Sequence, residues 1–238
     1  MINELGQPVG DPVPGWSARP LPAMPTLGGQ YCRLERLNAD RHAGELFAAD
    51  QTDVRGETWT YLPYGPFPDL KSYTRWARAA AADSDPFFYA IIDTDSQADQ
   101  ITAGRAVGVL SLLRVQPEAG SIEVGHVHYS PVLQRRRGAT EAQYLLMRYA
   151  FDDLGYRRYE WKCDALNATS RAAAERLGFR YEGTFRQAMV TKGRNRDTSW
   201  YSIIDTEWPV VGSRLRSWLA ADNFDDRGQQ KSGLVRRN

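Results

Sequence analysis

Hydrophobic and polar residues alternate along this chain with two different periods. Some short runs have an apolar residue at every second position, which is typical of half-buried strands, and longer runs repeat at spacings of three and four, which is typical of amphipathic helices. We predict strands at 31–37, 87–92, 106–113, 122–129, 158–163, 179–191 and 198–204. We predict helices at 40–50, at 70–82, from 139 to a stop at Gly155, and at 213–219, and a short helix that is capped by Asn167 or Ser170 and ends at 177. This order predicts an α+β fold with an α/β-like centre, in which helices flank a mixed, twisted sheet.

The two ends of the chain lack this periodicity. Residues 1–29 contain six prolines and five glycines, a composition that favours extended backbone over a packed core. We predict an extended N-terminal arm over 1–29, with Trp16 and Met24 as its contacts to the domain. The folded domain is predicted over 30–221, and a polar C-terminal tail over 222–238.

A basic turn lies between the strand at 122–129 and the central helix. It carries three successive arginines, Arg135, Arg136 and Arg137, followed by Gly138. A helix N-terminus presents free backbone N–H groups and the positive end of the helix dipole. We therefore predict that this turn binds a phosphate-bearing ligand. A solvated surface turn is the alternative.

Composition narrows the possible partners. The chain of 238 residues has a formal net charge of +1, so it does not resemble a strongly basic nucleic-acid binder. It has no apolar run of membrane-spanning length and no signal pattern at its N-terminus, so no membrane partner is expected and we interpret it as cytoplasmic. Its two cysteines do not make a disulfide framework, and Cys163 is expected to be a small buried residue.

Several short motifs occur in a recognisable order. They are Glu123-Val-Gly125, Ala139-Thr-Glu-Ala142, Asn167-Ala-Thr-Ser170, Leu177-Gly-Phe179, Tyr181-Glu-Gly183 with Arg186, and Gly193-Arg-Asn-Arg-Asp197. In this order and at these spacings the chain resembles the GNAT superfamily of acetyl-CoA-dependent N-acetyltransferases, and its RimJ/RimL-type branch, over roughly residues 27–209.

The resemblance implies where acetyl-CoA, the co-substrate, would bind. In the family the central strand splays from the next one, the pantetheine arm lies in the gap, and the following turn, Gln/Arg-x-x-Gly-x-Gly/Ala, holds the pyrophosphate. Gln134 and Ala139 match that turn, but Arg137 stands where the family has glycine. If the motif is moved by one residue, Gly138 takes the glycine position, and Thr140 stands where the family has a small last residue. We hypothesise that charge replaces part of the glycine-loop geometry. The implied cofactor-binding residues are His128, Gln134, Arg135, Arg136, Arg137, Gly138, Ala139, Thr140, Asn167 and Ser170.

Two of these residues have a purely structural alternative. Thr140-Glu-Ala-Gln143 fits a capping box, with Thr140 as the N-cap of the central helix. Asn167 is equally an N-cap candidate for the short helix that ends at Gly178. Capping and cofactor contact are compatible at both positions.

Acetyl transfer to an amine needs a proton acceptor, donors for the oxyanion and a proton for the thiolate. Glu123, His126 and His128 are candidate bases, although strand alternation places both histidines on the face opposite Glu123 unless a bulge intervenes. The tyrosine that other branches use corresponds to Ala174 here, and the glutamate that some RimL-like enzymes use corresponds to Met189, which leaves Asp197 and Tyr201 as further candidates. We predict Glu123 and Ser170 as catalytic residues and expect no metal.

The aromatic segment 59–67 is predicted to shape the acceptor site. Trp59, Tyr61, Tyr64 and His126 are the predicted substrate-binding residues, and packing of the helical layer is the alternative role. The expected reaction is acetylation of a primary amine on a small molecule or peptide N-terminus, by direct attack in a ternary complex. A non-catalytic acyl-CoA sensor and an interaction protein that uses its Pro-rich arm are the alternatives. Exposed strands in the last hairpin make a homodimer possible.

Overall fold

The strands form one eight-stranded sheet within the residues that the computed structural model describes, 1–95 and 102–234. The strands are β1 (Thr26–Gly28), β2 (Cys32–Arg36), β3 (Phe87–Asp93), β4 (Ala106–Gln116), β5 (Ser121–Tyr129), β6 (Arg158–Asp164), β7 (Arg180–Thr191) and β8 (Arg194–Ile204). They lie in the order β1-β2-β3-β4-β5-β6-β8-β7, and each neighbouring pair is antiparallel except β5 and β6. The predicted mixed sheet is confirmed.

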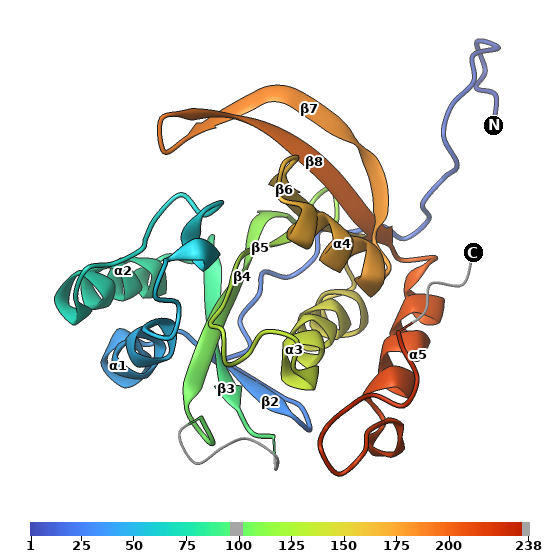
Figure 1. The fold of residues 1–238 in the computed structure, drawn as a ribbon. Helices are drawn as coiled ribbons and strands as arrows, with labels where there is room; N and C mark the ends of the chain where they lie inside the picture. The colour runs from blue at the N-terminus through green and yellow to red at the C-terminus, as the bar shows by residue number, and fades with distance from the viewer. Residues whose placement is uncertain (96–101, 235–238) are drawn as a thin grey trace.

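Helices cover both faces of this sheet (Figure 1). They are α1 (Ala39–Asp50), α2 (Leu70–Ala82), α3 (Arg137–Arg148), α4 (Ala168–Leu177) and α5 (Trp208–Leu219), with short helical turns η1 (Glu57–Trp59), η2 (Tyr149–Asp153) and η3 (Ala221–Asn223). The first two helices and η1 pack on one face and share a cluster of buried apolar residues with β3 and β4. The other three pack on the opposite face. In the part of the chain that the structure describes, no helix is long and apolar enough to cross a membrane.

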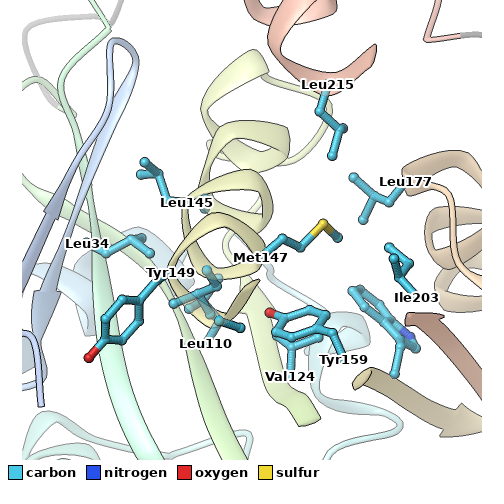
Figure 2. Close-up of a cluster of buried hydrophobic side chains, with 14 of the residues drawn as sticks. Leu34, Leu110, Val124, Leu145, Met147, Tyr149, Tyr159, Leu177, Ile203 and Leu215 are labelled. Carbon is cyan, nitrogen blue, oxygen red and sulfur yellow. The ribbon is translucent and has the colours of Figure 1, made fainter. Parts of the chain in front are cut away.

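The larger core surrounds α3 (Figure 2). Leu145 and Met147 of α3 are buried among side chains from the sheet below and from the two helices beside it, such as Leu177 of α4 and Leu215 of α5. Burial of a large aliphatic side chain contributes roughly 1.5–3 kcal/mol. This packing holds α3, and therefore the turn that precedes it, in a defined position on the sheet.

The predicted order of elements is confirmed, with three local differences. The sequence pattern missed β1, because its three residues are too few to show a period. Helix α3 begins at Arg137, with Arg136 as the N-cap residue, so the capping box predicted at Thr140 is wrong. The last hairpin has only two turn residues, Lys192 and Gly193, both with positive φ, which suits the twist of a two-residue β-turn.

The chain ends are tied to the domain. The Trp16 indole donates a hydrogen bond to the Glu118 carbonyl, 2.8 Å away, and the Met24 amide donates to the Tyr149 hydroxyl. Near the other end, Phe224 is buried against Tyr31. The predicted tail therefore includes an anchored aromatic residue, and its last four residues lie outside the described ranges.

Candidate active site and coenzyme site

Strands β5 and β6 separate halfway along their length. Their parallel pairing runs from Ser121 with Arg158 to Val124 with Trp161 and then stops, although both strands continue. Beyond that point β5 is paired only with β4. The result is a gap in the strand pairing, and peptide groups on the facing edges of two such strands can bind a ligand.

A β-bulge at His126 lies at the same point. Val109 pairs with His128 and Ser111 with Gly125, so the single residue between them on β4 faces two residues on β5. His126 has φ +49°, which shifts the alternation of the strand by one residue. Both histidine rings therefore contact aromatic residues of the α1–α2 face, the face that also carries Glu123. Regular alternation placed them on opposite faces, and the bulge is the physical reason that the structure does not.

The buried Glu123 carboxylate lies at the centre of an ion-pair network. Its side chain accepts hydrogen bonds from Arg114 Nη1 at 2.7 and 2.9 Å, and Lys162 Nζ lies 2.8 Å from Oε2. Lys162 also pairs with Glu160 and lies over the Trp200 ring, 3.6 Å from its centroid. Both oxygens of Glu123 are thus occupied by cations, which holds the carboxylate in one place.

His126 is half-buried next to this network. Its Nδ1 lies 3.1 Å from the Tyr64 hydroxyl, and its ring stacks on Tyr64 with centroids 5.6 Å apart. Burial, together with the charges of Arg114 and Arg196, lowers the pKa of His126 to about 4. At neutral pH the ring is therefore uncharged, and its Nε2 has no hydrogen-bond partner in the described part of the chain.

His128 is enclosed in the α1–α2 layer. Its ring stacks on Trp59 with centroids 3.7 Å apart, and Nε2 lies 3.0 Å from Thr58 Oγ1. Nδ1 lies 3.7 Å from Asp50 Oδ1. Burial lowers the pKa of His128 to about 4 and raises that of Asp50 to about 8, so at neutral pH this pair is uncharged in spite of its short distance. His128, a predicted cofactor-binding residue, is 2% exposed, and its ring packs within this layer.

The buried Asp50 carboxyl predicts a pH-dependent stability. Its pKa is higher in the folded than in the unfolded protein, so folding takes up a proton and this group destabilises the protein increasingly as pH rises from about 4 to about 8. We expect Asp50→Asn to raise Tm by about 5 °C or more at pH 8.5 and by almost nothing at pH 4.5. Thermal unfolding of both proteins at the two pH values measures this difference. An equal effect at both would contradict a protonated Asp50.

The basic turn before α3 uses its arginines in two ways. Gln134, Arg135 and Arg136 are exposed, and Arg135 adopts φ +61°, a left-handed conformation. Arg137 instead turns inward: its Nε donates to Asp95 Oδ2 at 2.6 Å, and its guanidinium lies 4.0 Å from the Tyr31 ring centroid. Its side chain stabilises the fold, and only its backbone belongs to the turn.

The first turn of α3 lies close to β2. A Cβ at Gly138 would lie 3.4 Å from the Tyr31 carbonyl oxygen, which is an ordinary van der Waals distance. Thr140, two residues after Gly138, is buried and accepts a hydrogen bond from Arg176 Nη1 at 3.1 Å. Ala139 lies between them and is half-buried.

Asn167 and Ser170 lie where β6 passes into α4. Asn167 Oδ1 accepts a hydrogen bond from the Ser170 amide at 3.0 Å, so the predicted N-cap is confirmed. Ser170 Oγ accepts from Trp161 Nε1, also at 3.0 Å. Since Trp161 is the last β6 residue paired with β5, the Ser170 hydroxyl lies close to the start of the gap.

The aromatic segment, the β6–α4 turn and the β7–β8 hairpin border the region around Glu123 and His126, which is called the groove below. Trp59 is buried, whereas the Tyr61 hydroxyl reaches across to the Leu166 carbonyl at 3.3 Å. From the tip of the β7–β8 hairpin, Lys192 Nζ donates to the carbonyls of Trp59 and Gly65, each at 2.8 Å. The segment is therefore joined to both the β6–α4 turn and the hairpin.

The sequence prediction missed several polar residues of this groove. Arg114 and Lys162 became visible only through strand pairing across Glu123, and no sequence pattern indicates them. In contrast, Arg196, Thr198 and Trp200 follow the period of a strand and could have been found from it. Among the described residues there is no group of three His, Cys, Asp or Glu side chains that could hold a metal ion.

Comparison with known proteins gave consistent matches. The model of the acetyltransferase (GNAT) domain matches residues 32–180. A GCN5-related N-acetyltransferase from Brucella melitensis is 46% identical, with a TM-score of 0.88 over 93% of this chain and 97% of that one. A probable acetyltransferase (GNAT family) from Chromobacterium violaceum ATCC 12472 is 43% identical, with a TM-score of 0.76 over 85% and 98% of the two chains.

The curated relatives match a shorter part. The protein named "Putative ribosomal N-acetyltransferase YdaF" from Bacillus subtilis (strain 168) is 30% identical over 105 residues, which is 44% of this chain and 57% of that protein. The chain thus spans about half the length of the curated relatives it matches.

Proposed function

Because the chain belongs to the GNAT acetyltransferase family, a family of acyltransferase enzymes that use acetyl-CoA, we propose that it acetylates a primary amine by direct attack in a ternary complex. The observation that carries this proposal is the split between β5 and β6, which continues along β5 into the basic turn and the N-terminus of α3. A gap between two strands that is followed directly by a helix N-terminus suits an extended ligand with a diphosphate at one end.

Acetyl-CoA is proposed to lie along this path. The pantetheine arm occupies the gap, and its diphosphate meets the backbone of residues 134–140 and the side chains of Gln134, Arg135 and Arg136. Asn167 and Ser170 flank the other side of the gap. The Ser170 hydroxyl, whose oxygen accepts a hydrogen bond from Trp161, is proposed to donate its proton to the departing thiolate.

The amine is proposed to enter from the groove lined by Tyr61, Tyr64 and His126. Glu123 takes its proton through a bridging water, because both carboxylate oxygens are held by Arg114 and Lys162. The neutral His126 ring accepts or donates a hydrogen bond at Nε2 and positions the amine. A protein or peptide N-terminus is favoured as the acceptor by the name of the relative YdaF, with a small-molecule amine as the alternative.

A homodimer through β7 is also part of this proposal. This strand is at the edge of the sheet formed by the described residues, and Phe185 and Val190 are exposed on it. An unpaired edge that carries apolar side chains is suited to pairing with a second copy. Sedimentation of the purified protein would show whether it is a dimer.

Calorimetry and an amine panel test the main proposal. We expect acetyl-CoA to bind, and thiol release from acetyl-CoA to depend on one class of amine, either peptide α-amines or small amines. Binding without turnover on any amine would favour the sensor function. No binding of acetyl-CoA or CoA would overturn the assignment of the gap and turn. Deletion of residues 1–27 tests the alternative that the chain is an interaction protein that binds a partner through its Pro-rich arm.

Two variants separate the proposed roles of the groove residues. We expect Glu123→Gln to lower kcat by about 100-fold, the range of a lost general base, with the Kd for acetyl-CoA unchanged. His126→Gln should instead raise the KM for the amine with a small change in kcat. Steady-state kinetics with a saturating acetyl-CoA concentration measures both. The reverse pattern would assign the base to His126 and leave Glu123 as a structural ion pair.

A further inference from the structure

The β7–β8 hairpin bridges the acceptor groove and is anchored at both ends of the bridge. At one end Trp200 of β8 packs under Lys162, which pairs with Glu123. At the other end Lys192 in the turn is bonded to the aromatic segment. The β8 residues between these anchors therefore lie between Lys162 and the aromatic segment, in the arched hairpin seen in Figure 1.

Three alternate residues of this part of β8 share one face. Because Trp200 faces Lys162 and the groove, strand alternation directs Arg196 and Thr198 to the same side. The lowering of the His126 pKa by the charge of Arg196 agrees with this direction.

Each of the three residues has a buried polar atom without a hydrogen-bond partner. These atoms are Arg196 Nε, Thr198 Oγ1 and Trp200 Nε1, and the Thr198 residue is only 4% exposed. A buried polar group without a partner costs about 1–3 kcal/mol. Three of them in a row on one strand face are unusual for a region with a structural role alone, and indicate a ligand that supplies the missing partners.

The chemistry of this row, Arg196, Thr198 and Trp200, favours a ligand with an anionic oxygen. Arg196 and Trp200 can only donate through these nitrogens, and the Thr198 hydroxyl can donate as well. The other buried cation of the groove, Lys162, is already paired with Glu123 and Glu160, whereas Arg196 forms no ion pair within the described residues. Asp164, which is opposite Thr198 in the strand pairing, accepts a hydrogen bond from the Leu166 amide instead. One positive charge and two neutral donors therefore remain for a carboxylate.

We propose that the acceptor is an amine that carries a carboxylate, and that Arg196, Thr198 and Trp200 bind this carboxylate and determine acceptor specificity. This inference rests on the proposed acetyl transfer and concerns the same groove. The carboxylate comes either from a free amino acid or from an acidic side chain of a peptide, and the two sources differ in what lies beyond it.

Matched acceptor pairs test the proposal. One pair is β-alanine and β-alaninamide, and the other is the peptide amide Ser-Glu-Phe with its glutamine analogue Ser-Gln-Phe. We expect the carboxylate member of one pair to have a kcat/KM at least about 10-fold higher than its neutral partner, because a site built to hydrogen-bond a group discriminates strongly against its absence. The pair that shows the preference identifies the source.

Substitutions of Arg196, Thr198 and Trp200 then test whether this row causes the preference for the carboxylate acceptor. Arg196→Gln should reduce it to less than about 3-fold, while the Kd for acetyl-CoA and the Tm stay close to wild type. Thr198→Val and Trp200→Phe should each raise the KM of the carboxylate acceptor by about 3–10-fold. Arg186→Gln, at an exposed arginine of β7, is the matched control and should change nothing. No preference in either pair, or a preference that survives Arg196→Gln, would overturn the proposal.

A binding measurement keeps the two proposals distinguishable. If no amine is acetylated, the proposed function fails, and calorimetry on the CoA-loaded protein then tests the row directly. Binding of β-alanine or the Ser-Glu-Phe amide that Arg196→Gln abolishes would support the carboxylate site. Absence of binding to the wild type would refute it.

Discussion

Reversal of two exposed charges, Arg135→Glu with Arg136→Glu, is expected to raise the Kd for acetyl-CoA by about 100-fold or more. Each charge-assisted contact to a phosphate contributes about 1.5–3 kcal/mol, and two lost contacts together correspond to at least two orders of magnitude in Kd. Both side chains are exposed at the turn, so the change should leave the Tm close to that of the wild type. Calorimetric titration with acetyl-CoA measures the effect.

The control for this experiment carries the same change of net charge elsewhere. Lys71→Glu with Arg75→Glu places two reversals on exposed positions of α2. Its Kd should stay within about 3-fold of the wild type, since screened surface charges at a distance contribute little. If both double variants weaken binding equally, long-range attraction rather than a site at the turn explains the affinity.

The largest effect on stability is expected from Glu141→Ala. The buried Glu141 side chain of α3 accepts hydrogen bonds from the backbone amides of Gln30, Tyr31 and Cys32, at 2.8, 2.6 and 2.8 Å. Removal of the carboxylate leaves these N–H groups without a partner. We expect a loss of about 4 kcal/mol of unfolding free energy and a fall in Tm of roughly 10 °C.

Two further variants test the cause of that loss. Glu141→Gln retains one acceptor oxygen and should show a smaller fall in Tm. Glu118→Ala removes an exposed carboxylate from the turn before β5 and should leave the Tm unchanged. A Glu141→Ala protein as stable as the wild type would mean that the contact between α3 and the start of β2 contributes little.

Local features of the site were predictable from the sequence. The Asn167 cap, the Gly178 stop of α4 and the bounds of α2 follow from residue types only a few positions apart. The basic turn was recognised for the same reason, because its arginines are adjacent in the chain and directly precede a helix. Such signals depend on the backbone of one segment, which responds to its own residues.

Contacts between distant segments were not predictable. Arg137 reads as a third phosphate ligand in the sequence, but in the fold it pairs with Asp95, 42 residues away. His126 and His128 read as a pair opposite Glu123, but a bulge set by the pairing with β4 brings them to the same face. A carboxylate or a ring has the same local pattern whether its partner is present or absent, so only the assembled sheet decides these roles.

The amino-acid pattern was sufficient for the order of elements, the family and the position of the basic turn before α3, since each depends on periodicity and on neighbouring residues. Tertiary structure decided which polar groups are consumed inside the fold and which remain for a ligand. Glu123 is held by Arg114 and Lys162, whereas Arg196, Thr198 and Trp200 retain unpartnered atoms toward the groove. The reason is physical: the free energy of a polar group depends on burial and on partners, and both are properties of chain segments brought together from far apart in the sequence.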